Sequence, residues 1–266
     1  LLGKVGNDAF GKLLVGTLEQ AGIGTSGIIM ADDVFTTLAF VTLDETGNRE
    51  FSFSRKPGAD TCLRYDELNM ELIDNAKVFH FGTLSLTDEP ARTTTYKAVE
   101  YAKAAGKLIT YDPNLRKPLW KDLEEAKKQL IWGMTKADVV KISEEEVEFL
   151  WGLGVEEGAD YILKNFDVKL VFVTCGADGC YFKNAVASGK VPSLSGIKVV
   201  DTTGAGDIFG GSAVYRLLEL NKPFAELTAE DLRYIGAFAS TAASLSTETL
   251  GGIPSIPEKD TVLKTM

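Results

Sequence analysis

Short apolar runs alternate with helical segments over most of the chain, and this alternation limits the fold more than any other feature. From about residue 76, helical segments separate runs that are rich in β-branched residues: AKVFHFG, KLITYD, DVVKIS, VKLVFVT and KVVD. Such alternation is typical of a parallel sheet with helices on both faces. Ligands bind beyond the carboxyl ends of the strands in such sheets, so we expect the functional site there.

Residues 24 to 62 have a different pattern, which predicts antiparallel strands. The runs TTLAFVTL (36–43) and REFSFS (49–54) are β-branched and aromatic, and the turn-forming cluster DETGN (44–48) separates them. The first run is apolar on both of its faces, so we expect other parts of the protein to cover both. We therefore predict an antiparallel pair that projects from the parallel sheet.

Composition and charge exclude several classes of partner. The chain has 266 residues, of which 45% are hydrophobic, and a net charge of -10, which disfavours nucleic acid and anionic membranes. No apolar run reaches the ~18 residues of a membrane helix. Three cysteines make a disulfide framework improbable and fit a reducing cytoplasm. The chain opens without Met, apparently inside a structural element, so we expect the full protein to begin upstream.

The stretch VVDTTGAGDIFGG (199–211) carries the clearest chemical signal. We expect a strand that ends at Asp201, a glycine-rich turn and then a helix. Gly204 and Gly206 let backbone N–H groups turn toward one point, and the start of the helix adds free N–H groups and partial positive charge. These features together predict a site for an anion such as phosphate.

Asp207 lies inside this predicted anion hole, where a carboxylate would repel a bound phosphate. Its presence is explained if it takes a proton from a hydroxyl group that attacks phosphorus, while the amides stabilise the transferring phosphoryl group. The alternative is that Asp207 caps the helix, as Asp commonly does. Residue types and spacing alone leave both interpretations open.

Several motifs in the same order resemble the ribokinase-like sugar kinases of the PfkB family. DTTGAGD resembles the carboxyl-terminal signature of that family, and GKVGNDAFGKLL (3–14) its early glycine motif. YDPNLRKPLW (111–120) and KISEEEVEFL (141–150) resemble fructokinases in particular. The resemblance implies one kinase domain over 1–266, apparently without its first strand. It implies a three-layer α/β/α core with a mainly parallel sheet and a small β-sheet lid, for which 24–60 is the candidate.

The same resemblance implies ATP-dependent phosphorylation of a sugar hydroxyl with Mg²⁺. Because the motifs are most similar to those of fructokinases, the expected reaction converts D-fructose to fructose 6-phosphate. It assigns catalysis to Asp207, Gly204, Ala205, Gly206 and Arg116. It assigns the substrate to Arg55, Asp112, Asn114 and Asp207. It assigns ATP to Lys141, Ser143, Thr174, Gly176, Gly179, Gly206 and Ser240. For single members of these sets, the alternatives are a solvated Arg or a plain glycine hairpin in VTCGADGCYF (173–182).

Metal ions are implied at two places. Glu146 matches the Glu that helps to position Mg²⁺ through water, although Ser143 stands where the family usually has Asn. The alternative for this segment is an acidic first helical turn, which the helix dipole favours. Many family members also bind K⁺ beside the anion hole, where oxygen atoms would be the ligands. In this chain, that resemblance selects Asp201, Thr203, Ser246, Gly251 and Ser255.

The resemblance further implies a cytoplasmic enzyme with a small sugar and ATP as its ligands, and a homodimer formed through the lid. Two other functions remain open. One is a kinase for 2-keto-3-deoxygluconate or ribose, because the Asp and the G-G-x-x-x-N segment that contact the sugar in the family do not occur here. The other is a non-catalytic relative that binds a sugar or a nucleotide.

Overall fold

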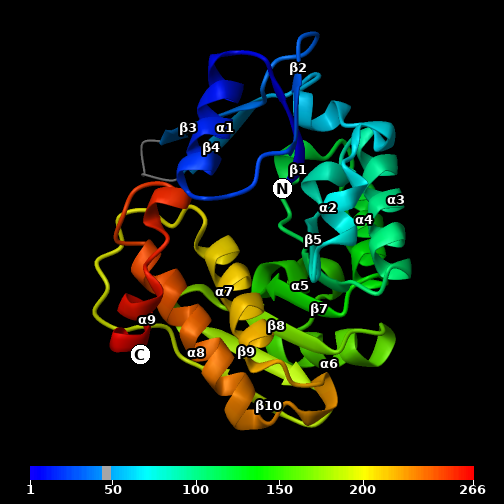
Figure 1. Cartoon of the computed structure of the whole chain (residues 1–266). Helices are drawn as coiled ribbons and strands as arrows, with labels where there is room; N and C mark the ends of the chain where they lie inside the picture. The colour runs from blue at the N-terminus through cyan, green and yellow to red at the C-terminus, as the bar shows by residue number, and fades with distance from the viewer. Residues whose placement is uncertain (44–48) are drawn as a thin grey trace. The chain divides into compact units, whose positions relative to one another are not determined.

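Two compact units make up the protein, as a computed structural model that describes residues 1–43 and 49–266 shows (Figure 1). Unit 1 comprises Leu1–Ile109 and Asn114–Lys136. Unit 2 comprises Thr110–Pro113 and Ala137–Met266. All the residues that the sequence assigns to the anion hole and the nucleotide therefore belong to unit 2.

A mixed sheet forms the centre of unit 2, with its strands in the order β10-β9-β8-β7-β6. The strands are β6 (Leu108–Asp112), β7 (Val139–Ser143), β8 (Leu170–Thr174), β9 (Cys180–Asn184) and β10 (Ser188–Val191). The pairs β6–β7 and β7–β8 are parallel, whereas β8–β9 and β9–β10 are antiparallel. The parallel strands predicted at KLITYD, DVVKIS and VKLVFVT are thus confirmed, and an antiparallel hairpin extends them.

Helices cover this sheet. They are α5 (Glu144–Trp151), α6 (Val155–Asn165), α7 (Ala205–Leu220), α8 (Ala229–Ser246) and α9 (Lys259–Thr265), with short turns of 3₁₀-helix at η5 (Gly176–Asp178), η6 (Phe224–Glu226) and η7 (Ile253–Ser255). α6 packs on β8 and β9, and α8 packs on β9, β10 and α7 (Figure 1). Consecutive residues Val171 and Phe172 of β8 are both buried, so both faces of the sheet are covered.

The helical face predicted for α7 is confirmed, but the strand predicted before it is wrong. Phe209, Ala213 and Leu217 are all buried on α7. Residues 198–201 form no strand, because the backbone N–H groups of Val200 and Asp201 donate to the Thr247 carbonyl after α8, at 2.7 and 3.0 Å. Their amides are therefore not paired with a strand of the sheet.

Unit 1 contains two small sheets. β1 (Leu2–Gly6) and β2 (Gly27–Ala31) pair in parallel, and α1 (Ala9–Gln20) connects them along the chain. β3 (Leu38–Leu43) and β4 (Arg49–Ser54) form a separate antiparallel pair. The remaining elements are η1 (Ala59–Cys62), η2 (Tyr65–Glu67), α2 (Met70–Asp74), β5 (Val78–Gly82), η3 (Leu84–Leu86), α3 (Ala91–Ala104), η4 (Lys117–Leu119) and α4 (Leu123–Met134).

The antiparallel pairing predicted for 36–43 and 49–54 is confirmed, and the predicted turn at 44–48 lies outside the described residues. The antiparallel pattern does not extend to β2, which pairs in parallel with β1. The expectation that both faces of the first run are covered is also wrong, because the Phe40 side chain is 54% exposed.

The early glycine motif joins β1 and α1 to the segment that leads into β3. Asp8 caps α1 by accepting a hydrogen bond from the Gly11 N–H at 2.8 Å, and it also accepts from the Thr36 N–H at 2.8 Å. These bonds, above all the one from the Thr36 backbone, lower the pKa of the Asp8 carboxyl. A Cβ on Gly11 would lie 1.9 Å from the Gly6 carbonyl oxygen, so this crossing requires glycine.

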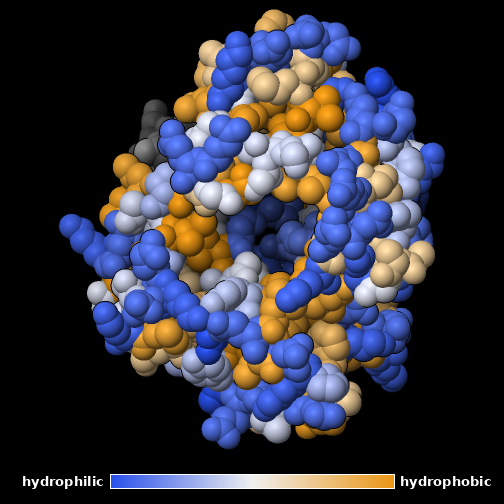
Figure 2. Space-filling view, in the orientation of Figure 1, coloured by the Kyte–Doolittle hydropathy of each residue, from blue (hydrophilic) through white to orange (hydrophobic). Residues whose placement is uncertain are grey.

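Hydrophilic residues make up much of the visible surface of each unit, with hydrophobic patches among them (Figure 2). Over the described residues, every helix is too short or too polar to cross a bilayer.

Candidate active site

The amino-terminal turn of α7 forms the centre of the candidate site. Gly204 is the residue before the helix and has a left-handed backbone with φ of 79°, which favours glycine. No side chain caps this helix end. The Ala205 N–H donates to the Thr202 carbonyl at 3.3 Å, so the next N–H groups, those of Gly206 and Asp207, are left for a ligand. Asp207 is the third helical residue and is exposed. The helix cap is thus Gly204, and the capping interpretation of Asp207 is wrong.

Asp201 holds the turn before α7 in place. One of its carboxylate oxygens accepts hydrogen bonds from the N–H and hydroxyl groups of Thr203, at 3.0 and 2.7 Å. The other accepts from the Gly251 N–H at 2.9 Å. A Cβ on Gly204 would lie 3.2 Å from the Cα of Gly252, so the two segments are in close contact. Asp201 therefore fixes the glycine-rich turn against residues 251–252.

A cleft of about 750 Å³ runs along unit 2 to the start of α7. It brings together five residues that the sequence assigned to ATP, and Ala205 lines it as well. The five are Thr174, Gly176, Gly179, Gly206 and Ser240. Asp207 does not line this cleft; it lines a second hollow of about 490 Å³, with Gly204, Ile208, Phe238, Ile253 and Lys259.

The glycines of the β8–β9 hairpin differ in what they contact. Gly179 has φ of 91°, and a Cβ there would lie 2.0 Å from the Val191 carbonyl oxygen. Gly176 has φ of 52°, and a Cβ there would meet no atom within 4 Å. Close packing of the hairpin against the end of β10 therefore accounts for Gly179, whereas Gly176 borders open space.

Lys141, in the middle of β7, and Asp112, the last residue of the neighbouring parallel strand β6, form a buried ion pair. Lys141 Nζ lies 3.0 Å from Asp112 Oδ2, and the two side chains are 13% and 7% exposed. Burial raises the pKa of Asp112 to about 6; Lys141 opposes this rise, whereas Glu146 and Asp207 add to it. A Cβ on Gly206 would lie 3.0 Å from Lys141 Nζ, so the ammonium group lies against the start of α7.

Ser143 and Glu146 form a capping box at the start of α5. The Ser143 N–H donates to Glu146 Oε2 at 3.0 Å, and the Glu146 N–H donates to the Ser143 hydroxyl at 3.2 Å. Glu146 is buried, whereas Ser143 is partly exposed. Thus the structure gives both residues a role in ending β7 and starting α5, in keeping with the acidic first turn.

The residues selected for K⁺ lie on two segments that contact each other. Asp201, Thr203 and Gly251 share the hydrogen bonds given above. Ser246 and Ser255 are buried, and each hydroxyl donates to a carbonyl of its own turn, that of Ala243 at 2.8 Å and that of Gly252 at 2.7 Å. Across residues 1–43 and 49–266, no group of three or more acidic, His or Cys side chains could hold a metal ion.

Three residues assigned to the sugar or to catalysis belong to unit 1. Arg55 is buried, and its guanidinium group donates to Asp60 at 2.8 Å, to Thr87 at 2.7 Å and to the Leu84 carbonyl at 2.8 Å. The alternative of a solvated Arg is therefore wrong for Arg55. Asn114 has a left-handed backbone with φ of 51°.

Arg116 differs from Arg55 in being exposed. It donates from Nη1 to the Leu115 carbonyl at 3.3 Å, a long bond that leaves most of its five N–H donors for a ligand.

Sequence reasoning missed one wall of the cleft. Ala243 and Ser244 of α8, and Thr247 directly after it, line it together with Ser240. Their spacing of three, four and seven residues from Ser240 places them on one helical face, so the pattern was available in the sequence. The missed turn at 192–197 faces them, and the Leu194 N–H donates to the Ser244 hydroxyl at 3.3 Å.

Comparisons with known proteins agree with this geometry. Residues 1–259 match the pfkB family carbohydrate kinase model. A probable fructokinase-2 of Arabidopsis thaliana is 43% identical over 257 residues, which are 96% of this chain and 77% of that protein.

Among solved structures, fructokinase with bound ATP from Xylella fastidiosa has a TM-score of 0.91 at 31% identity, over 99% of this chain and 83% of that one. Fructokinase from Vibrio cholerae O395, solved with fructose, ADP and calcium ion, has a TM-score of 0.87 at 30% identity, over 99% of this chain and 84% of that one. The three-layer ribokinase-like fold expected from the sequence is therefore confirmed, and the chain belongs to the pfkB family of carbohydrate kinases.

Proposed function

We propose that this protein is an ATP-dependent kinase that phosphorylates D-fructose to fructose 6-phosphate. The observation that carries the proposal is the exposed carboxylate of Asp207 beside uncapped N–H groups at the start of α7, where the cleft ends. An anion hole and a base are the two parts that phosphoryl transfer to a hydroxyl needs. The choice of fructose rests on the likeness to fructokinases.

ATP would occupy the cleft of unit 2. Its volume of about 750 Å³ falls in the usual range for small-molecule sites. The phosphates would lie at Ala205 and Gly206, where N–H groups and the helix dipole favour an anion. The adenine ring of ATP would lie toward Ser240, between the hydroxyl-bearing face of α8 and the turn at 192–197. Thr174 and Gly176 would border the nucleotide at the end of β8.

In the reaction, the sugar hydroxyl attacks the terminal phosphorus of ATP. The bond between that phosphorus and the oxygen of ADP breaks, a new bond to the sugar oxygen forms, and the hydroxyl proton passes to Asp207. The N–H groups at the start of α7 hold the charge on the phosphoryl oxygens during transfer. Asp207 lines a different hollow from the nucleotide cleft.

Mg²⁺ fits this site as an ion that arrives with the nucleotide. The described residues hold no dedicated cage of carboxylates, and Mg²⁺ in kinases is usually bound by phosphates, waters and one or two protein groups. Glu146 would hold it through water, with Ser143 beside it. When bound, the ion neutralises phosphate charge.

K⁺ would be held by loop oxygen atoms around Asp201, Thr203, Ser246, Gly251 and Ser255, on the two segments that Asp201 joins. It would steady the anion hole.

Asn114 and Arg116 would be the other contacts, near the sugar or the transferred phosphate. Arg116 keeps most of its donors, which suits a ligand of this kind. Most of the N–H donors of Arg55 are already bonded within the protein. Arg55 would therefore contact the sugar through its remaining donors or hold the chain around it in the shape that the sugar requires.

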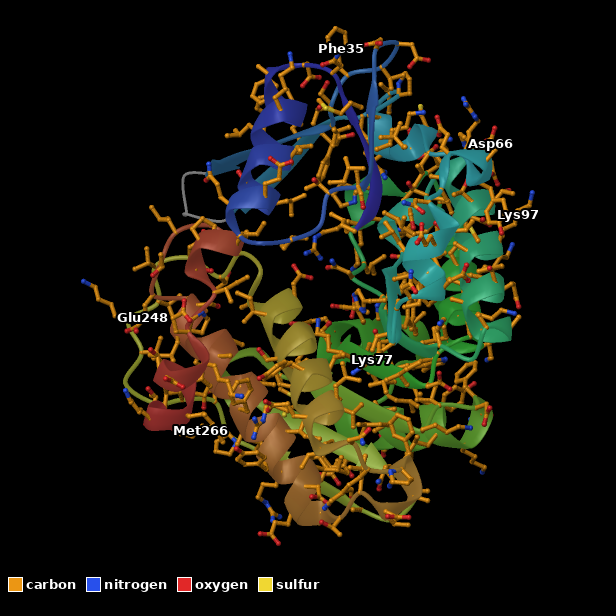
Figure 3. All side chains as sticks on the ribbon, in the orientation of Figure 1. Phe35, Asp66, Lys77, Lys97, Glu248 and Met266 are labelled. Atoms are coloured by element: carbon orange, nitrogen blue, oxygen red, sulfur yellow. The ribbon has the colours of Figure 1, made fainter. Side chains whose placement is uncertain are left out.

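We also propose that the chain acts as one kinase domain with 24–60 as its lid, in keeping with the separate β3–β4 sheet. Two such lids would pair in a homodimer. Phe40 on β3 and Phe35 just before it are 54% and 80% exposed, and Phe35 projects from the ribbon of unit 1 (Figure 3). We place the enzyme in the cytoplasm, where three free thiols are stable.

The test of this function uses Asp207→Asn, which keeps the shape of the side chain and removes the base. Turnover with saturating ATP and fructose should fall ~10²–10⁴-fold, as is typical when a general base is lost. ATP affinity, measured by calorimetry, should hold or improve, because the variant removes a negative charge near the phosphates. Near-normal turnover would contradict the assignment of the base.

The sugar is tested separately. Fructose, ribose and 2-keto-3-deoxygluconate should be compared by kcat/KM with the same enzyme preparation, and fructose should give the highest value. A higher value for either of the others would replace fructose as the substrate and leave the kinase chemistry standing. Binding of ATP or of a sugar without turnover of any of the three would favour a non-catalytic binding role.

A further inference from the structure

The ion pair between Lys141 and Asp112 has features that stability alone does not explain. Both side chains are largely buried, and the second carboxylate oxygen, Asp112 Oδ1, is buried without a hydrogen-bond partner in the described structure. Removing two charges from water is costly, and a buried ion pair often stabilises a protein less than apolar residues of the same size would. Such a pair therefore indicates a function that requires the charge.

The position of the ammonium group indicates what that function is. Lys141 Nζ lies so close to Gly206 that a Cβ there would be 3.0 Å away, and Gly206 is the second residue of α7. The amino-terminal end of a helix carries partial positive charge, so a cation beside it is unfavourable unless an anion joins them. Of the three ammonium donors, Asp112 Oδ2 accepts one, which leaves two for such an anion.

We propose that Lys141 contacts the terminal phosphate of the bound nucleotide and that Asp112 is a positioning residue, which holds the Lys141 ammonium group at the start of α7. This inference rests on the proposed function, which puts the phosphates at this helix end. It replaces the expectation from the sequence that Asp112 contacts the sugar.

The physical role of Lys141 follows from the charge that develops during transfer. Its ammonium group would face the oxygens of the phosphoryl group, while the sugar proton goes to Asp207. In a site shielded from water, a fixed positive charge stabilises these oxygens far more than it would in solution. Lys has a flexible four-carbon stem, so it needs a partner to keep its charge in one place. Asp112 provides that partner from the end of the neighbouring strand β6.

The first experiment compares Lys141→Met with the wild type. We expect kcat to fall ~10²–10³-fold, as for the loss of one charge-stabilising group. Calorimetry should show at least ~10-fold weaker binding of ATP and a change of less than ~3-fold for ADP, which lacks the terminal phosphate. The KM for fructose should stay nearly constant. Lys141→Arg, which keeps the charge, should recover part of kcat.

Asp112→Asn tests the positioning role. It should lower kcat and ATP affinity in the same direction as Lys141→Met but by less. The double variant should be no worse than Lys141→Met alone, because Asp112 acts through Lys141. A rise in the KM for fructose with unchanged ATP affinity would instead make Asp112 a sugar ligand and overturn the inference.

Gly206→Ala gives an independent test that keeps both charges. The added methyl group would force Lys141 Nζ away from the helix, whereas the helix itself gains propensity and should fold normally. ATP affinity and kcat should both fall. Lys190→Met, on the exposed side of β10 and paired with Glu156, is the matched control and should change neither.

The results separate this inference from the proposed function. Failure of the wild-type protein to bind ATP would reject both. Normal ATP binding and turnover in the wild type, with an unchanged ratio of ATP to ADP affinity in Lys141→Met, would reject the role of Lys141 and leave the kinase assignment intact.

Discussion

Ala205 is the residue at which the proposed anion hole can be altered with the least disturbance. It is the first residue of α7 and lines the cleft, whereas Gly204 has a left-handed backbone and Gly206 lies against Lys141. Ala205→Asp should raise the dissociation constant of ATP at least ~10-fold, because a carboxylate would repel the phosphates. The helix should remain folded, since an acidic residue in the first turn is favourable.

The matched control is Ala205→Asn, which has the same shape and no charge. Calorimetric titration of ATP into both variants separates charge from size. Equal affinities for the Asp and Asn variants would mean that the phosphates do not bind at the start of α7.

The same residues show how far the sequence predicts a site. Gly204, Gly206 and Asp207 could be proposed from the sequence because their chemistry lies within one turn of the chain. The pairing of Lys141 with Asp112 was missed, because it depends on strands β6 and β7 being neighbours in the sheet. Asp112 stands at the carboxyl end of β6, where ligand groups gather, and a charged Lys141 in the middle of the otherwise apolar strand β7 was the other available signal.

At the scale of elements, the β8–β9 hairpin contains a matched pair of glycines. Gly179→Ala would place a methyl group 2.0 Å from the Val191 carbonyl oxygen, in a backbone conformation that L residues rarely adopt. In Gly176→Ala the added methyl group would point into open space. The only cost would be that of a left-handed backbone, about 1–2 kcal/mol.

Chemical denaturation should therefore show a larger loss of unfolding free energy for Gly179→Ala than for Gly176→Ala. Strained backbone positions cost on the order of 1–3 kcal/mol, and the clash at Gly179 adds to that cost. Comparable losses in the two variants would mean that the hairpin relaxes away from β10 without penalty.

The elements also differ in how well the sequence predicted them. Strands β6, β7 and β8 are apolar runs buried on both faces, and their pattern identified them. The run at 198–201 has the same β-branched pattern, but its amides bond to the end of α8, so its local sequence was misleading. The parallel pairing of β1 and β2 was missed because it joins segments on either side of α1.

At the scale of the whole molecule, the proposed homodimer can be tested by substituting the exposed aromatic residues of unit 1. The double variant Phe35→Ser and Phe40→Ser should shift the mass in light scattering from dimer toward monomer, because it removes apolar surface from the lid. Val186→Ser, a 65% exposed residue of unit 2, should leave the mass unchanged. A wild-type protein that stays monomeric at high concentration would contradict the dimer.

The uncapped start of α7 would link nucleotide supply to the lifetime of the protein. Side chains cap α1, α4, α5 and α8, whereas α7, with its 16 residues, is among the helices that have no such cap. A missing cap costs about 1 kcal/mol, and a bound phosphate would take its place. In a cell that runs short of ATP, more of this kinase would then be in its less stable free form, which proteases cleave more readily.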